Sequence, residues 1–264
     1  MNLSIIIPLY NEVENIPRLK RELSPILTEL AQSHIIEVVF VDDGSTDSTY
    51  KTLLDAFTDV ISPHLSFCIQ NHPHNHGLGA ALRTGFSSAK GDIIVTTDSD
   101  GSYRFNEIPD LLSCLRQQVD IVTASPYHPD GKVLGVKGYR VLLSRCSSMI
   151  YRLLVDWRIH TYTSLFRAYR REVIEKVDFQ CDGYLAVAEI LINSILMDYR
   201  VVEYPTNLYK RTLGFSKVKL ARTIMDHLGY QTRVLFHRLG LKSVIKHDYK
   251  RRIEKHPSTR EIPQ

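Results

Sequence analysis

The stretch GDIIVTTDSDGSYRFNEIPD, residues 91–110, joins a buried strand to an acidic turn. Its β-branched run over residues 93–97 is typical of a strand that is covered on both faces of a parallel sheet. The run ends at Asp98 and Asp100, with only Ser99 between them. Two neighbouring carboxylates repel, and each raises the pKa of the other unless a cation compensates. The stretch predicts a cation-binding sheet edge, and a solvated acidic loop is the alternative.

In the sequence around this stretch, short apolar runs alternate with segments whose apolar residues have helical spacing. Such an order predicts an α/β fold with a mostly parallel sheet flanked by helices. We expect the other strands of this half at residues 3–7, 35–41, 65–69 and 121–124, and helices at residues 16–30, 50–57, 78–89 and 108–115.

The rhythm changes after Pro126, where a glycine-bearing loop precedes a helix that runs through Trp157. We then expect a strand leading into a helix within residues 164–177, a helix over 184–197 and a last strand over 200–204. The resulting division is one domain, residues 1–217, with a first half of about 1–125 and a second half of about 126–217, followed by a tail, 218–264.

The tail carries most of the excess positive charge of the chain. The whole sequence has 33 basic and 29 acidic residues, whereas residues 218–264 contain 11 basic against 4 acidic ones. Apolar positions at 220, 224, 228, 235 and 239 predict an amphipathic helix with a basic face. Such a helix suits peripheral contact with an anionic membrane or packing on the domain. No stacking or base-reading motif accompanies it, so nucleic acid is not expected as a partner.

Composition sets the expected compartment. The four cysteines form no CxxC pair, which argues against a zinc ribbon or a disulfide framework and fits a reducing cytosol. The start of the chain lacks the pattern of a signal peptide, and no run approaches the roughly 20 apolar residues of a membrane helix. We therefore expect a cytoplasmic protein, either free or peripheral on the cytoplasmic face of the membrane.

Polar residues cluster where three of the predicted strands end. The first strand ends in PLYNE, residues 8–12, the second in DDGSTD, residues 42–47, and the fourth in Asp98-Ser99-Asp100. In an open parallel sheet, ligands bind beyond these carboxyl ends. Because Mg²⁺ and Mn²⁺ take one or two protein carboxylates and complete their shell with phosphate oxygens, the acidic pair suggests a metal-bound diphosphate.

The chain resembles the family 2 glycosyltransferases, in particular their dolichol-phosphate (polyprenyl-phosphate) mannosyltransferase branch. The resemblance covers about residues 3–217 and is carried by segments in family order: SIIIPLYNEVENI, VVFVDDGSTDST, NHGLGAALRTGF, GDIIVTTDSD, TSLFRAYRREVIEKV, GYLAVAEIL, YRVVEYP and RTLGFSK. It implies a glycosyltransferase A-type fold with a nucleotide-sugar half and an acceptor half. The implied activity is metal-dependent, inverting transfer of mannose or glucose from a GDP- or UDP-hexose to a polyprenyl phosphate.

The resemblance also implies roles for particular residues. Those expected to bind the donor are Pro8, Tyr10, Asn11, Glu12, Val41, Asp42, Asp43, Asp98, Ser99, Asp100 and Lys217. The expected ligands of Mg²⁺ or Mn²⁺ are Asp98, Asp100 and Ser102. The catalytic candidates are Asp100, Arg211 and Glu189, although a packing carboxylate is an equal reading of Glu189. Arg145, on a helix with Arg140 and Arg152, is the candidate for acceptor binding, and a solvated basic stripe is the alternative.

Three departures from the family pattern leave the acceptor open. Gly101 and Ser102 replace the usual Leu-Gln, Pro126 replaces an arginine, and TYTSLFR, residues 161–167, replaces Asp-Pro-Thr-Ser-Gly-Phe-Arg. Two alternatives therefore stand beside the polyprenyl phosphate acceptor. One is transfer to a hydroxyl of a polysaccharide, lipid or small molecule, and the other is a degenerate member that binds a nucleotide without catalysis.

The sequence NHPHNHG, residues 71–77, brings three histidines together. Pro73 and the lack of regular structure favour an exposed loop over a metal site. We expect this loop to lead into the helix that begins near residue 78.

Overall fold

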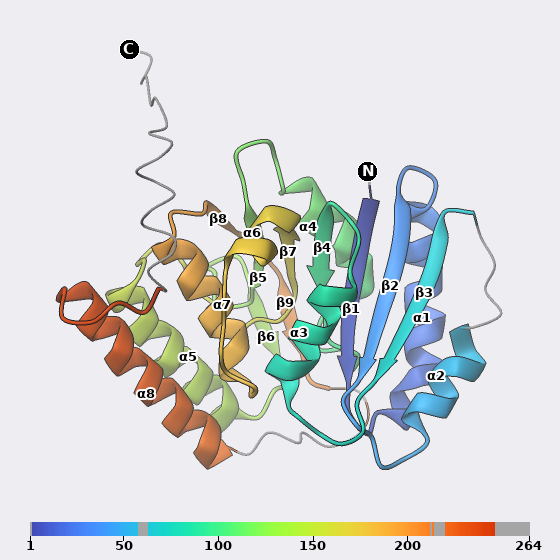
Figure 1. Ribbon diagram of the computed structural model, residues 1–264, viewed down its shortest axis with the longest axis horizontal. Helices are drawn as coiled ribbons and strands as arrows, with labels where there is room; N and C mark the ends of the chain where they lie inside the picture. Colours follow the sequence, from blue (N-terminus) through green and yellow to red (C-terminus); the bar gives the residue numbers. More distant parts are fainter. Residues whose placement is uncertain (1, 58–62, 212, 214–219, 246–264) are drawn as a thin grey trace.

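The structure is a computed structural model, and it describes residues 2–57, 63–211, 213 and 220–245. A seven-stranded sheet forms its centre, with helices on both faces (Figure 1). The strands of this sheet are β1 (Asn2–Leu9), β2 (Ile35–Asp42), β3 (Leu65–Asn71), β4 (Ile93–Thr96), β5 (Ile121–Ser125), β7 (Arg167–Arg170) and β8 (Val201–Pro205). All of the strands expected from the sequence are present, so the predicted α/β fold is confirmed.

The sheet has the order β3-β2-β1-β4-β7-β5-β8. The strands β1 to β4 are parallel, and β5 pairs in parallel with β8. Between these two groups lies β7, which is antiparallel to both β4 and β5. The sheet is therefore mostly parallel, and its one antiparallel strand joins the two halves of the chain.

Helices from both halves cover the sheet. One face packs against α1 (Ile16–Leu30), α2 (Thr49–Phe57) and α4 (Ile108–Ser113) through a core that includes Leu23, Phe40 and Leu53. The other face packs against α3 (Leu78–Ser88) and α7 (Leu185–Leu196) through a core that includes Ile6, Leu82 and Leu191. Both faces of the sheet are thus buried, which accounts for the continuous apolar runs of its strands.

Shorter elements complete the connections. The short helices are η1 (Val13–Asn15), η2 (Phe105–Glu107) and α6 (Arg171–Lys176). A second, two-stranded parallel sheet pairs β6 (Lys132–Leu134) with β9 (Asn207–Tyr209). No sequence pattern predicted these two strands, because each has only three residues.

Two long helices, α5 (Gly138–Leu154) and α8 (Leu220–Arg238), pack side by side beyond α7 (Figure 1). The side of α8 that faces the protein contains Tyr230 and Val234, both fully buried. Leu228, Leu235 and Leu239, which belong to the predicted apolar stripe, are instead 48%, 41% and 62% exposed. The helix expected in the tail therefore exists, and the predicted apolar positions divide: positions 220, 224 and 228 line a cavity between α8 and α5, whereas Leu235 and Leu239 face outward.

No helix in the described part of the chain combines the length and apolar character needed to cross a bilayer.

Candidate functional site

A polar cavity of about 1050 Å³ lies at the carboxyl ends of β1 and β4. The residues that the sequence predicted and that line it are Pro8, Tyr10, Glu12, Asp43, Asp98, Ser99, Asp100, Ser102 and Arg211. They come from the carboxyl ends of three strands, β1, β2 and β4, and from the segment after β9. The parallel sheet thus gathers residues from distant parts of the sequence at one edge, as its topology requires.

Asp98 and Asp100 stand on a sharp turn after β4. The Asp100 carboxylate accepts a hydrogen bond from the backbone N–H of Ser102 at 2.9 Å. Neither the Asp98 carboxylate nor the Ser102 hydroxyl makes a hydrogen bond to another described residue. Two side chains with oxygen donors therefore remain available for a ligand beside the bonded Asp100.

Arg211 links two acids across the cavity. Its guanidinium lies 2.8 Å from Asp100 Oδ2 and 3.0 Å from Glu12 Oε1. The other Glu12 oxygen accepts a hydrogen bond of 2.6 Å from the Asn15 amide. One arginine thus holds the segment after β9 against the ends of β1 and β4.

The charge balance of the cavity fits a bound divalent cation. Burial and the nearby Asp100 carboxylate raise the pKa of Asp98 to about 8, even though Arg211 opposes the shift. A bound cation stabilises the charged form of a carboxylate most when burial disfavours ionisation and no hydrogen-bond donor of the protein compensates. The donor set of two carboxylates and a hydroxyl is the all-oxygen type that suits Mg²⁺ or Mn²⁺.

The turn depends on Gly101 and on an arginine beneath it. Gly101 has a φ of +76°, and a Cβ added there would lie 1.6 Å from Nη1 of Arg18. The Arg18 side chain is buried and donates a hydrogen bond of 2.7 Å to the Ser99 carbonyl. The departure from leucine at this position therefore has a physical cause, because Arg18 occupies the space that a side chain would need.

The acidic pair after β2 divides into two environments. Asp42 is 1% exposed, and no residue in the described part of the chain donates a hydrogen bond to its Oδ2. Burial raises the pKa of this carboxyl group, although Ser45 donates hydrogen bonds to its Oδ1. Buried polar atoms are normally hydrogen-bonded, so this oxygen can still accept a hydrogen bond.

Asp43 is instead saturated by the loop over residues 72–77. Its carboxylate pairs with His72 Nδ1 at 2.7 Å and accepts hydrogen bonds from the Asn75 amide and the backbone N–H of His76 and Gly77. His72 also bonds to Thr84 of α3. The histidine loop is therefore anchored at His72, and it leads into α3 as expected.

Other predicted residues lie away from the cavity wall. The Val41 side chain is in the core. Asn11, with a φ of +52°, accepts a hydrogen bond of 2.7 Å from the backbone N–H of Thr46 and so braces the turn after β2. Lys217 lies outside the described residues.

Glu189 and Arg145 are also placed apart from Asp98. Glu189 is 3% exposed, accepts a hydrogen bond of 2.9 Å from the Cys181 N–H and lines a separate cavity with α8 residues. Arg145 is exposed and stacks over Tyr127, with 5.2 Å between the guanidinium and the ring centroid. These contacts describe a packing carboxylate and a surface cation.

A second cavity, of about 550 Å³, lies between α5 and α8 and is lined mainly by apolar and aromatic side chains. Asp98, Ser102 and Arg140 line both cavities, so the two meet at the acidic turn. Sequence reasoning chose Arg145 and left out Arg140. The helical phase of α5 contained the signal, because positions 140, 144, 147 and 151 lie on the side that faces the protein.

The chain belongs to glycosyl transferase family 2, whose model matches residues 4–178. The branch predicted from the sequence is represented among its relatives. The chain is 34% identical to polyprenol monophosphomannose synthase of Mycolicibacterium smegmatis over 81% of its own length and 80% of that protein. It is 32% identical to dolichol-phosphate mannosyltransferase of Pyrococcus furiosus over 89% of its length, but spans only 64% of that protein.

Solved structures share the fold. Glucosyl-3-phosphoglycerate synthase from Mycobacterium tuberculosis, in complex with Mn²⁺, UDP and glucosyl-3-phosphoglycerate, superposes with a TM-score of 0.62 at 21% identity, covering 92% of this chain and 81% of that one. A structure of the same synthase with Mg²⁺ and UDP gives a TM-score of 0.63 at 20% identity, with the same coverage. The likeness confirms the predicted glycosyltransferase A-type architecture.

Proposed function

We propose that the protein transfers a hexose from a nucleotide sugar to a polyprenyl phosphate, with inversion at the anomeric carbon. The observation that carries the proposal is the meeting of a polar and an apolar cavity at Asp98 and Arg140. Membership of glycosyl transferase family 2 supports the sugar donor, and the names of the relatives support the lipid phosphate.

The donor occupies the polar cavity in this proposal. Asp43 and the end of β1 line the part of this cavity that we assign to the nucleoside. Asp42 lies next to them but does not line the cavity, and no described residue donates a hydrogen bond to its Oδ2. Asp98, Asp100 and Ser102 would hold Mg²⁺ or Mn²⁺, which when bound neutralises the diphosphate of the donor. Arg211 moves between its carboxylate partners and the departing diphosphate, and Lys217 is expected to assist it.

The acceptor occupies the apolar cavity. Its hydrocarbon chain lies between α5 and α8, and its phosphate lies near Arg140, where the two cavities join. Arg140 bonds to Tyr139 through Nε, and its charge remains beside the acidic turn. Arg145, on the exposed side of α5, serves the approach of the phosphate to the cavity.

The cavity favours a phosphate over a hydroxyl as the nucleophile. A hydroxyl must lose a proton to a general base, whereas a phosphate oxygen is already anionic at neutral pH. Among the described residues that line the apolar cavity, Asp98 is the one carboxylate, and Glu189 lies in another cavity. The imidazole of His227 is a weak base, because burial lowers its pKa to about 4.

The outer surface of α5 and α8 supports contact with a membrane. Leu142, Met149 and Leu153 of α5 are 62%, 60% and 80% exposed at helical spacing, and Met225 of α8 is 67% exposed. Basic residues accompany them on both helices. A lipid acceptor would pass from the bilayer into the adjoining apolar cavity without crossing water.

The decisive experiment compares acceptors under identical conditions. Purified protein is incubated with GDP-mannose or UDP-glucose and Mn²⁺, together with either a polyprenyl phosphate or the matching polyprenol. We expect product only with the phosphate and a loss of at least about 100-fold in kcat for Asp100→Asn. Asp55→Asn, on the exposed surface of α2, is the matched control and should retain full activity.

Two results would contradict the proposal. Equal transfer to the polyprenol would favour a hydroxyl acceptor. Absence of turnover with every donor, in protein that still binds a nucleotide, would favour a degenerate family member.

A further inference from the structure

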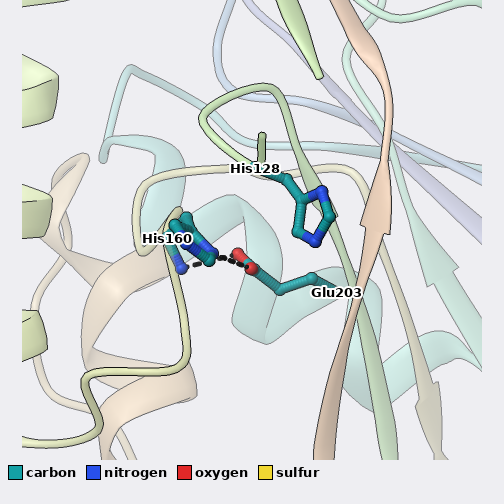
Figure 2. Close-up of side chains that lie close together, drawn as sticks. All are labelled: His128, His160 and Glu203. Carbon is teal, nitrogen blue, oxygen red and sulfur yellow. Dashed lines mark hydrogen bonds and ion pairs between the residues drawn. The ribbon is translucent and has the colours of Figure 1, made fainter. Parts of the chain in front are cut away.

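Three side chains that commonly bind metals meet at a site that the proposed reaction does not use. They are His128, in the turn after β5, His160, in the segment between α5 and β7, and Glu203, in β8 (Figure 2). One ligand atom from each lies within 4.8 Å of the other two, and all three residues are partly buried. Zinc bonds of about 2.1 Å keep ligand atoms roughly 3.4 Å apart, so small side-chain rotations would bring all three onto one ion.

Glu203 fixes His160 in place. One carboxylate oxygen accepts hydrogen bonds from the backbone N–H of His160 at 2.8 Å and of Thr161 at 3.0 Å. The other pairs with His160 Nδ1 at 2.6 Å, as the dashed lines in Figure 2 show. Glu203 lies opposite Thr123 in the paired strands β8 and β5, so the sheet itself sets its position. The sheet and the backbone hydrogen bonds therefore hold two of the three groups close together. If His160 ligates through Nδ1, the proton that it shares with Glu203 is released to solvent when the ion binds, which frees both atoms as ligands.

His128 is held less firmly than His160, because its side chain contacts Asp130 and the His160 ring but does not bond to the sheet. Its ring lies edge-on to that of His160, with 5.3 Å between centroids. Asp130 places both a backbone N–H, at 3.2 Å, and a carboxylate oxygen, at 3.5 Å, beside Nδ1 of His128. Either neutral tautomer of the ring thus has a partner, and the carboxylate can accept Nδ1–H while the other nitrogen binds an ion.

We propose that His128, His160 and Glu203 form a second metal site, specific for a transition metal such as Zn²⁺. Two imidazole nitrogens and one carboxylate are a donor set of that class, whereas Asp98, Asp100 and Ser102 offer only oxygen. His128 and Glu203 also line a cavity of about 920 Å³ that is open to solvent. This cavity lets an ion reach the site and leaves room for a water molecule as the fourth ligand.

The ion would stabilise the wall of the apolar cavity. Thr161, next to His160, shares a hydrogen bond of 2.8 Å with Ser125, and its hydroxyl accepts the Tyr127 N–H at 3.3 Å. Thr161 and Tyr127 both line the apolar cavity. Binding at the three residues would therefore fix the turn after β5 against the segment before β7. This inference concerns a separate site and does not depend on the proposed transfer reaction.

Calorimetric titration of metal-free full-length protein with ZnCl₂, in excess Mg²⁺, tests the site. Mg²⁺ occupies the all-oxygen site, and it competes poorly for imidazole nitrogen. We expect one Zn²⁺ per chain and at least roughly tenfold weaker binding in His128→Ala. The same Zn²⁺ concentration should raise the melting temperature of the wild type and not that of the variant. His34→Ala, in the turn between α1 and β2, is the matched control and should behave as the wild type.

Two outcomes would overturn the inference. One is the absence of Zn²⁺ binding by the wild type. The other is binding of unchanged affinity in both His128→Ala and His160→Gln, which would place the ion elsewhere. The His160→Gln side chain retains an N–H donor for Glu203, so this variant separates loss of a metal ligand from loss of the structural hydrogen bond. Circular dichroism establishes that each variant is folded before titration.

Discussion

At the scale of single residues, Gly101 and Arg18 show how one departure from a family pattern is compensated. The acidic turn accommodates the guanidinium of Arg18 directly beneath Gly101, and the Ser99 carbonyl accepts a hydrogen bond from it. Within the described ranges, Nε and Nη1 of Arg18 have no hydrogen-bond partner, although Nη1 lies 3.5 Å from a carboxylate oxygen of Glu22. The position of Asp98 and Asp100 therefore depends on an arginine that lies outside the acidic motif.

Gly101→Ala should lower the free energy of unfolding by about 1–3 kcal/mol through backbone strain, because a side chain at a φ of +76° is unfavourable. The overlap of the added Cβ with Arg18 adds to this cost. Gly229→Ala is the matched control. Gly229 lies in α8 with nothing within 4 Å of an added Cβ, so alanine there should stabilise the helix by up to about 1 kcal/mol. Urea unfolding measures both changes, and a neutral effect of Gly101→Ala would contradict the assigned packing.

Arg140 and Arg145 provide a direct comparison on one helix. Arg140 lines both cavities, whereas Arg145 lies on the exposed side of α5. Arg140→Gln should reduce kcat/KM for a polyprenyl phosphate by roughly 10-fold to 100-fold, as expected for loss of a charged hydrogen bond. Arg145→Gln should reduce it by less. The reverse order, measured with saturating donor, would mean that the phosphate does not bind where the cavities join.

At the scale of elements, the sequence predicted the strands and helices of the first half because their apolar periods are long and regular. It did not predict that β7 runs antiparallel. RAYR, residues 167–170, is a strand of four residues, and nothing in its sequence indicates the direction in which it pairs. Of the apolar positions predicted for the tail helix, 220, 224 and 228 line the cavity between α8 and α5, but the predicted pattern was incomplete. The predicted set of apolar positions omitted His227, Tyr230 and Gln231, whose polar atoms form hydrogen bonds with α5 or α7. A pattern based on apolar residues alone cannot anticipate a helix that docks through satisfied polar groups.

The docking of α8 should be sensitive to acid. Tyr151 and Ser147 of α5 lie 3.0 and 3.2 Å from His227 Nδ1. Burial lowers the pKa of His227 to about 4, although Asp226 opposes this. Between about pH 4 and 6.5 the unfolded chain binds a proton that the folded protein excludes, so stability falls as the pH is lowered through this window.

His227→Gln should remove that part of the pH dependence. The slope of the unfolding free energy against pH between 4 and 6.5 should decrease by at most about 1.4 kcal/mol per pH unit, the value for one proton. Above pH 7 the slopes of variant and wild type should coincide. His34→Gln is the control. An unchanged acid slope in His227→Gln would show that other groups dominate the acid sensitivity.

At the scale of the whole molecule, strand ends could be assigned to one sheet edge from the sequence, which is why Asp98, Asp100 and Glu12 were predicted together. Arg211 was placed with them only by the resemblance to the family. The structure adds that Arg211 bridges two of these acids. His128, His160 and Glu203 were not predicted, because they come from three segments with no common spacing. Contacts of this kind follow only from the packing of β5 beside β8.

Membrane contact can be tested on the same scale. Replacing Leu142 and Leu153 with glutamate should reduce sedimentation with anionic phosphatidylglycerol vesicles by more than tenfold, because both exposed apolar area and charge balance change. Ile35→Glu removes a comparably exposed apolar residue, 56% exposed, at the start of β2 and should have little effect. Equal losses in both variants would mean that α5 does not face the lipid.

The antiparallel strand β7 also constrains the order in which the protein can be assembled. Arg170 donates hydrogen bonds to carbonyls at residues 116 and 119, and Arg171 donates to carbonyls at residues 89 and 91. A nascent chain that has emerged only as far as β5 must therefore leave the edge of β4 unpaired. The ribosome has to deliver about 45 further residues before that edge is closed, so the amino-terminal half depends on a late segment for protection against misassembly during synthesis.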